Sequence, residues 1–388
     1  MDNRAIIPAA LILDLDDMMW HDGRDLRRKG QASRTEFPRT HVKEDYLVIE
    51  ELGRALNMKI ICPICLGDWD KDNYLRGVVG LTHNPHGWNR KEEIDMELAN
   101  QYFEAAEGSE HIDYAIHALL HGLYDENGKH LNELQYFYKD ADGVAHLLPN
   151  EQLELQLDLF FKIYNSWGFK KDIVTFCPPC GIPLRDYSDW ASIDRFSSVL
   201  YKRGVRYIIA RWQKGREYSC INSGVLYIEK NALCGAPSSV YDVNPDYVAD
   251  FGKDGDESFG DVFGMHWNNF LHYYPADSFK RIPQWIEWFK RQAEVFGLML
   301  SRDMRFTGNQ CIYRKNSVVT VEGDKCTVDI SGALAIGFDD LGKEFSVSFK
   351  NDSLPKSCVG GKMELYEEKE KFKTYRITYE KTKIEFQL

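Results

Sequence analysis

Two short stretches of the chain carry side chains that suit a divalent metal ion. The first follows the apolar run 9–13 and contains Asp16 and Asp17, and the second places His117 and His121 four residues apart after another apolar run. One carboxylate and two imidazoles can hold a catalytic ion while further coordination positions stay open for water or substrate. We therefore predict a metal site with Asp17, His117 and His121 as ligands and zinc as the first choice of ion.

The other aspartate of the pair has a different predicted role. Beside a cation, Asp17 would stay ionised as a ligand, whereas Asp16 would lie within reach of an activated water and could act as a general base. A plainer alternative is that Asp14, Asp16 and Asp17 cap a turn and that His121 is a loop histidine. Because both motifs follow strand-like runs, we favour the metal site.

A proline-rich turn follows the apolar run 172–176. Cys177 precedes Pro178, Pro179, Cys180 and a glycine, and two prolines ahead of a glycine build a rigid turn with backbone N–H groups beyond it. The turn formed by Pro178, Pro179 and Cys180 could therefore present an amide to a developing oxyanion.

The cysteines offer an alternative metal site. Cys177 and Cys180 form a Cys-x-x-Cys pair, and Cys62 and Cys65 form another. Two such pairs could hold a structural zinc. We favour this less than the Asp-His-His site, because Cys62 and Cys65 belong to a run that is typical of a buried strand. A redox role for Cys177 and Cys180 fits less well still.

Apolar runs and amphipathic segments alternate up to residue 305. The runs predict strands over residues 9–13, 59–65, 112–117, 172–176, 205–210 and 261–265. Helices are predicted over residues 46–56, 92–106, 152–164, 193–202 and 282–293. Near-continuous apolar strands between helices are typical of a parallel sheet that is covered on both faces or closed into a barrel. The expected fold class is α/β, with a deformed (β/α) barrel over residues 1–305.

The pattern changes after residue 305. Short alternating runs, separated by turn residues, cover residues 317–321, 326–330, 345–349, 375–379 and 384–386. They predict a small all-β, sandwich-like domain over residues 306–388, which we interpret as a lid or packing module in preference to a carbohydrate-binding one. In the barrel, the loops at the carboxyl ends of the strands converge, so the predicted metal ligands would meet at one rim.

Loops at the same rim supply the predicted substrate contacts. Indole rings could stack on sugar rings, and carboxylates could accept hydrogen bonds from sugar hydroxyls. The candidate substrate-binding residues are Asp68, Trp69, Trp88, Glu133, Arg211 and Trp267. For Trp69 and Trp88, packing under a long loop is the ordinary alternative. Glu133 could instead orient a metal-ligating histidine.

Together, the motifs resemble those of the polysaccharide deacetylase superfamily, carbohydrate esterases with a deformed (β/α) barrel. The resemblance implies that Asp16 is the catalytic base and that Asp17, His117 and His121 hold the metal. It also implies that His266, within Met-His-Trp-Asn-Asn, is the catalytic acid. The implied reaction is metal-assisted hydrolysis that removes an N- or O-acetyl group from a sugar.

One position departs from the family pattern and keeps alternatives open. Cys177 stands where the family commonly has an arginine, the electrostatic partner of the base. A glycoside hydrolase-type barrel of the same superfamily, with Asp16 as nucleophile, or a non-catalytic glycan-binding barrel would also fit. A haloacid-dehalogenase-type phosphatase is a further alternative, because Asp14 and Asp16 form an Asp-x-Asp motif after a buried strand. His272 is a second candidate for the acid.

Composition limits the partners. The 388 residues carry a formal net charge of −12 without long acidic blocks, which disfavours nucleic acid and anionic membranes as partners. No apolar stretch approaches the ~20 residues of a membrane span, and the first residues do not resemble a signal peptide. With nine cysteines, we expect a cytoplasmic protein with reduced thiols and a carbohydrate as partner. A chain trimmed of its signal would look the same.

Overall fold

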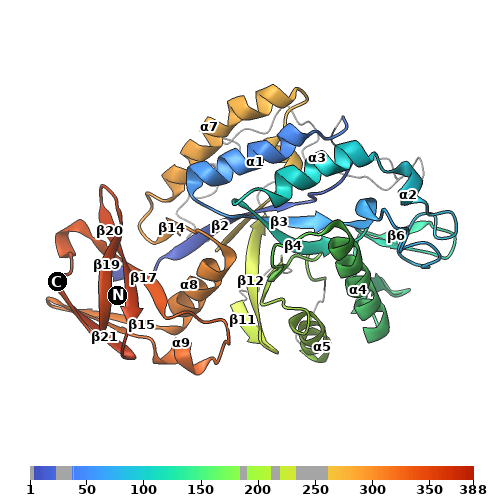
Figure 1. Cartoon of the computed structure of the whole chain (residues 1–388). Helices are drawn as coiled ribbons and strands as arrows, with labels where there is room; N and C mark the ends of the chain where they lie inside the picture. Colours follow the sequence, from blue (N-terminus) through green and yellow to red (C-terminus); the bar gives the residue numbers. More distant parts are fainter. Residues whose placement is uncertain (1–3, 23–36, 38, 184–189, 211–218, 233–260) are drawn as a thin grey trace.

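The central element is a closed parallel barrel. The computed structural model describes residues 4–22, 37, 39–183, 190–210, 219–232 and 261–388 (Figure 1). Within these residues, seven parallel strands pair around the barrel, and the last pairs with the first. Their order is β10 (Tyr207–Ala210), β9 (Thr175–Phe176), β4 (Ile112–Ala118), β3 (Ile60–Cys65), β2 (Ala9–Asp16), β13 (Val262–His266) and β12 (Val225–Ala232). The predicted α/β class and deformed (β/α) barrel are confirmed.

Burial on both faces explains why the barrel strands have so few polar residues. Every residue of β3 is buried, as is every residue of β2 except Asp16, which is half-buried. Such strands face the barrel interior on one side and helices on the other, which favours near-continuous apolar sequence. Two further strands flank the barrel: β11 (Ser219–Asn222) runs antiparallel to β12, and β14 (Leu298–Leu300) pairs in parallel with β2.

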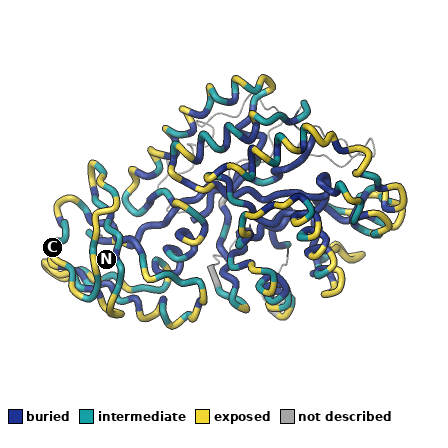
Figure 2. The backbone as a smooth tube through the Cα atoms, viewed as in Figure 1, coloured by how far each residue is buried: buried dark blue, intermediate teal, exposed yellow. Residues whose placement is uncertain are grey.

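Helices cover the barrel. Helices α1 (Lys43–Leu56), α3 (Met96–Glu107) and α7 (Pro275–Gln292) lie on the upper side in Figure 1, and α1 contacts both of the others. Helices α4 (Asn150–Trp167), α5 (Trp190–Tyr201) and α8 (Met304–Asn316) lie on the lower side. Figure 2 shows the strands between them as the buried centre of the molecule. Shorter helical turns are α2 (Arg90–Glu93), α9 (Ser331–Ala335), η2 (Gly67–Trp69), η4 (Trp267–Phe270) and η5 (Asn351–Ser353).

Two four-stranded antiparallel sheets make up the all-β part. One has the order β1 (Ala5–Ile6), β17 (Glu344–Lys350), β20 (Phe372–Tyr379) and β19 (Gly361–Glu368). The other has the order β15 (Val318–Glu322), β16 (Lys325–Asp329), β21 (Lys383–Gln387) and β18 (Ser357–Val359). The rings of Phe349 and Phe386, one from each sheet, lie with centroids 5.1 Å apart, so the sheets share a core. All-β sheets beside the barrel were expected from the sequence and are present.

The all-β part also includes the beginning of the chain. Strand β1 pairs antiparallel with β17, with Ala5 opposite Phe349. Helix α8 contacts both β2 of the barrel and β17. The division between residues 305 and 306 stays a prediction.

Two hairpins follow β4 on the way to α4. Strand β5 (Leu123–Tyr124) pairs with β6 (His130–Asn132), and β7 (Phe137–Lys139) pairs with β8 (Ala145–Leu147). The first hairpin returns the chain toward the end of β4 and so brings Glu133 back to His121. Among the helices in the described ranges, none is both long and apolar enough to cross a bilayer.

Candidate active site

The carboxyl ends of the barrel strands bring the chemistry-bearing side chains together. Asp16 is the last residue of β2 and Asp17 follows it; His117 lies near the end of β4, and His266 is the last residue of β13. Because parallel strands end at the same rim, residues far apart in the sequence become neighbours there. His121 reaches the same place from the loop after β4.

Asp17 lies at the centre of three histidines. Its Oδ1 is 3.6 Å from His117 Nε2 and 3.5 Å from His121 Nε2, and its Oδ2 is 3.9 Å from His266 Nε2. Zinc–ligand bonds of about 2.0–2.2 Å in a tetrahedral arrangement separate the ligand atoms by about 3.4 Å. The spacing of Asp17 from His117 and His121 therefore fits a shared ion.

Each of the two histidines near Asp17 is oriented through its other ring nitrogen. His117 Nδ1 lies 2.6 Å from the carbonyl oxygen of Cys177, and His121 Nδ1 lies 3.0 Å from Glu133 Oε2. Such partners fix the tautomer and turn Nε2 toward a metal. The Nε2 of His117 is buried and has no hydrogen-bond partner among the described residues, which is the environment expected of a nitrogen that binds an ion.

The electrostatics around His117 favour a positive charge at this position. Burial acts to lower its pKa, but Asp17, Asp16 and the carbonyl of Cys177 outweigh burial, so the net pKa is raised. A divalent cation would satisfy the same field and would displace the proton.

The backbone is strained at three predicted site residues. Asp17 (φ 66°), His121 (φ 50°) and Cys180 (φ 57°) adopt left-handed conformations, which cost side-chain-bearing residues free energy and gather at functional sites. The turn of Pro178, Pro179 and Cys180 follows β9 at the same rim and is closed by the Gly181 N–H, which donates to Pro178 O at 3.1 Å. Its role toward an oxyanion stays a prediction.

A buried lysine that sequence reasoning missed lies beneath the predicted base. The Lys230 ammonium, on β12, forms ion pairs with both Asp14 and Asp16; its Nζ is 2.5 Å from Asp14 Oδ2. The Cys177 thiol lies 3.3 Å from Asp16 Oδ1 and 3.5 Å from Lys230 Nζ. Asp16, which the sequence left without a cationic partner, therefore has one from a different strand.

Asp14 and Asp16 have pKa values shifted in opposite directions, although both pair with Lys230. Burial raises the pKa of Asp14 to about 7, although Lys230 acts in the opposite direction. At Asp16, burial also acts to raise the pKa, but Lys230 and nearby histidines outweigh it and hold the pKa at about 2. Asp16 is therefore ionised at neutral pH.

Several predicted substrate contacts lie in the core. The indole N–H of Trp88 donates to Asp70 Oδ2 at 2.8 Å, and that of Trp267 donates to the Asp45 carbonyl oxygen at 3.2 Å. Trp69 and Asp68 are buried as well. No more than 2% of any of these four residues is exposed, which favours the packing alternative for Trp69 and Trp88. A role of these residues toward a substrate stays a prediction.

The remaining candidates divide into three cases. Glu133 Oε2 lies 3.0 Å from His121 Nδ1, a contact that suits the predicted role of orienting a histidine. Arg211 lies outside the described residues. His272, the second candidate acid, interacts with Asp277 at 3.6 Å near the start of α7.

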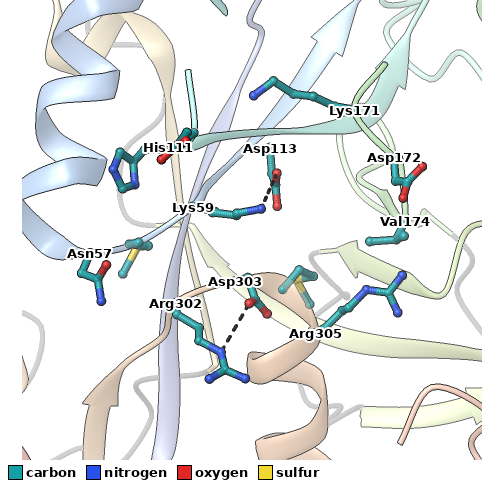
Figure 3. Close-up of a pocket in the computed structure, with 13 residues that line it drawn as sticks. Asn57, Lys59, His111, Asp113, Lys171, Asp172, Val174, Arg302, Asp303 and Arg305 are labelled. Atoms are coloured by element: carbon teal, nitrogen blue, oxygen red, sulfur yellow. Dashed lines mark ion pairs between the residues drawn. The ribbon is translucent and has the colours of Figure 1, made fainter. Parts of the chain in front are cut away.

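A pocket of about 680 Å³ lies at the amino-terminal ends of the barrel strands (Figure 3). Its charged groups largely satisfy one another: Lys59 pairs with Asp113 at 3.8 Å, and Arg302 pairs with Asp303 at 3.5 Å. The Lys171 ammonium donates to the Ile112 carbonyl oxygen at 2.7 Å. The pocket therefore gives no preference for a ligand of either charge.

Comparison with known proteins identifies the fold. The sequence matches no protein-family model and no curated protein. Among solved structures, Agd3, described as a novel carbohydrate deacetylase, matches 98% of this chain and 65% of its own at 10% identity, with a TM-score of 0.50. This chain thus spans just under two thirds of Agd3.

Two other solved structures are family 4 carbohydrate esterases. The enzyme from Streptomyces lividans, solved with acetate, matches 76% of this chain and 92% of its own at 12% identity (TM-score 0.34). The esterase of Streptococcus mutans matches 76% and 86% at 10% identity (TM-score 0.38). The match to Agd3 shows that the chain shares the fold of that protein.

Proposed function

We propose that this chain is a metal-dependent carbohydrate deacetylase, a hydrolase that removes an N- or O-acetyl group from a sugar. The observation that carries the proposal is the cluster of Asp17, His117 and His121, with Asp16 beside it, at the carboxyl rim of the barrel. Zinc is the proposed ion, because imidazole and carboxylate ligands suit it. Agd3, whose fold the chain shares, is described as a carbohydrate deacetylase.

In the proposed reaction, the residues around the ion divide the proton transfers. An ion held by Asp17, His117 and His121 would polarise the acetyl carbonyl and acidify a water molecule. Asp16 would accept the proton of that water. With its pKa at about 2, Asp16 is a weak base, so the reaction depends on the acidity that the ion gives to the water.

The second proton transfer would use His266. Its side chain is 27% exposed, and its Nε2 lies 3.9 Å from Asp17 Oδ2, so the ring can reach both the site and solvent. It would donate a proton to the leaving amine or alkoxide. The turn of Pro178, Pro179 and Cys180 is proposed to face the oxyanion.

Metal analysis and acetate release test the proposal together. Wild-type protein should contain near-stoichiometric zinc and release acetate from acetylated amino-sugar oligomers, and the His117→Ala/His121→Ala variant should lose both. His146→Ala serves as the control, because His146 forms an exposed pair with Asp140 and has no proposed role in the site. Metal that persists in the double variant, or acetate release that a chelator leaves unchanged, would contradict the proposal.

Asp17→Ala, tested for acetate release and for glycan affinity, separates the proposal from a non-catalytic alternative. In a non-catalytic glycan-binding barrel, Asp17→Ala would leave the affinity for the glycan unchanged, and no acetylated sugar would release acetate. A phosphatase with Asp14 as nucleophile is disfavoured, because the Asp14 carboxylate is fully buried and paired with Lys230.

A further inference from the structure

We infer that Cys65 is a ligand of the proposed metal site and binds the ion from its buried side. The inference rests on the proposed function, because it concerns the same ion. It adds a sulfur ligand to a site that the sequence motifs describe as Asp-His-His.

Strand order places Cys65 between the two predicted ligands. Strand β3 lies between β2 and β4 in the barrel, and Cys65 is its last residue. Asp17 follows the end of β2, and His117 lies near the end of β4. The Cys65 N–H donates to the Met18 carbonyl oxygen at 3.0 Å, which holds the end of β3 against the loop that carries Asp17.

A bulge in β4 turns His117 toward the same point. Ile64 pairs with Ile116, but Cys65 pairs with Ala118, so His117 is the extra residue in the ladder. Bulges of this kind occur beside active sites and re-aim a side chain. Here the bulge places the His117 ring next to the end of β3.

The three side chains are compact enough to share an ion. One ligand atom from each of Asp17, Cys65 and His117 lies within 4.8 Å of the other two. All three residues are buried, and His117 Nε2 has no hydrogen-bond partner in the described part of the chain. A buried nitrogen that lies beside a thiol and a carboxylate and makes no hydrogen bond to a described residue is therefore a second indication of an ion at this position.

The ligand set has a chemical consequence. A thiolate with an imidazole and a carboxylate suits zinc and disfavours the hard ions magnesium, calcium and manganese. Cys65 would be the fourth protein ligand beside Asp17, His117 and His121. Water would then bind as a fifth ligand, a coordination number that catalytic zinc can adopt. We expect the site to select zinc over manganese.

Cys177 is the rival sulfur. It forms a comparable group with Asp16 and His117. However, its thiol already lies 3.3 Å from Asp16 Oδ1 and 3.5 Å from Lys230 Nζ, and a cation at the thiol would have to lie beside the ammonium. Cys65 is the better ligand because its group contains Asp17, a proposed ligand, whereas the Cys177 group contains the proposed base Asp16 instead.

X-ray absorption on the zinc-loaded full chain tests the inference without a variant. A sulfur at about 2.3 Å from zinc, beside nitrogen and oxygen ligands at about 2.0–2.2 Å, is expected. A zinc site with nitrogen and oxygen ligands alone would overturn the Cys65 inference and leave the proposed Asp-His-His site intact. A chain that binds no zinc would overturn both.

Cobalt substitution identifies which cysteine is the ligand. The Co²⁺-loaded wild type should show a thiolate-to-metal charge-transfer band in the near ultraviolet, and Cys65→Ser should lose the band while still binding Co²⁺. Cys62→Ser is the matched control, since Cys62 is buried on the same strand but donates to the Ile60 carbonyl oxygen. A band that survives Cys65→Ser and disappears in Cys177→Ser would overturn the inference. If Cys65→Ser fails to fold, Cys177→Ser decides between the two cysteines: a band that persists in this variant supports Cys65, and its loss overturns the inference.

Discussion

Asp14 and Asp16 share one buried cation. Residues two apart on a strand point to the same face, so both carboxylates of β2 meet the Lys230 ammonium from β12. Removing one partner of a buried ion pair leaves an uncompensated charge and costs about 3–5 kcal/mol. Lys230 therefore affects both the stability of the barrel and the charge of the proposed base.

Lys230→Met should lower stability and move the acid limb of activity to higher pH. Lys230 holds the folded-state pKa of Asp16 at about 2, below its ordinary value of 3.8. This pairing therefore stabilises the fold at pH above 3.8, and the contribution is lost as the pH falls through about 2. Without Lys230, burial raises the pKa of Asp16, and protonation of the base begins at higher pH.

The measurements for Lys230→Met are urea unfolding and the pH profile of kcat/KM. We expect the free energy of unfolding to fall by about 3 kcal/mol or more. Lys91→Met, at an exposed position in α2, should change neither quantity. An acid limb at its wild-type pH in Lys230→Met would show that Lys230 does not control Asp16.

Glu133→Gln should weaken metal binding without removing a ligand. Glu133 Oε2 lies 3.0 Å from His121 Nδ1, and loss of a carboxylate that orients a ligating histidine typically lowers metal affinity about 10–100-fold. Competition with a chelator measures the affinity. Asp140→Asn, which alters the exposed pair with His146, is the control. Equal affinity in Glu133→Gln and wild type would show that Glu133 does not act through His121.

Strand β12 closes the barrel, although no strand is predicted over 225–232. The apolar runs predict the strands β2, β3, β4, β10 and β13, because each has a local sequence that fits a buried strand. In β12 the run is interrupted by Glu229, Lys230 and Asn231. A lysine inside a barrel is stable only through carboxylates that lie more than two hundred residues earlier in the chain, and a local pattern cannot indicate that pairing.

The candidate site was predictable to the extent that its ligands follow local motifs. Asp16, Asp17, His117 and His121 follow strand-like runs, and the barrel brings them together. Lys230 has no such signal, because it is a single residue in a strand and its neighbours are set by strand order. Cys65 belongs to a Cys-x-x-Cys motif, but that motif predicts a cysteine-rich zinc site, and only strand order and a bulge bring Cys65 to Asp17 and His117. Tryptophan is a residue type that suits sugar binding, but the indoles of Trp69 and Trp88 are in the core.

A glycine in the neighbouring strand makes room for Lys230. A Cβ at Gly264 of β13 would lie 2.1 Å from Lys230 Cε, so Gly264→Ala should force the ammonium away from the two carboxylates. We expect a loss of about 1–3 kcal/mol, as for other overpacked sites, and the same direction of shift in the acid limb as in Lys230→Met. The loss is measured by urea unfolding.

A double-mutant cycle tests whether Gly264→Ala lowers stability by displacing Lys230. If Gly264→Ala acts through Lys230, it should cost much less in a Lys230→Met background than in the wild type. Equal costs in the two backgrounds would mean that the alanine disturbs β13 by another route.

The first strand of the chain pairs with a strand of the all-β part. Strand β1 completes the sheet that contains β17, and the buried side chain of Gln310 on α8 joins the two regions. Its amide donates to the carbonyl oxygens of Pro8 (2.9 Å) and Ser346 (3.0 Å) and accepts from the Ser346 N–H (2.9 Å). Contacts between residues about three hundred positions apart leave no local trace in the sequence, so the participation of β1 could not be predicted.

Gln310→Leu should destabilise the barrel and the all-β sheets together. The substitution leaves two carbonyl oxygens and one N–H without their partner, and each buried group left unsatisfied costs about 1–3 kcal/mol. If Gln310 joins the two regions, calorimetry of the wild type should show one unfolding transition, and Gln310→Leu should lower its midpoint or divide it in two. Gln152→Leu, at an exposed position in α4, should leave the midpoint unchanged. Two transitions in the wild type, with only the all-β one shifted by Gln310→Leu, would instead support independent units that divide near residue 305.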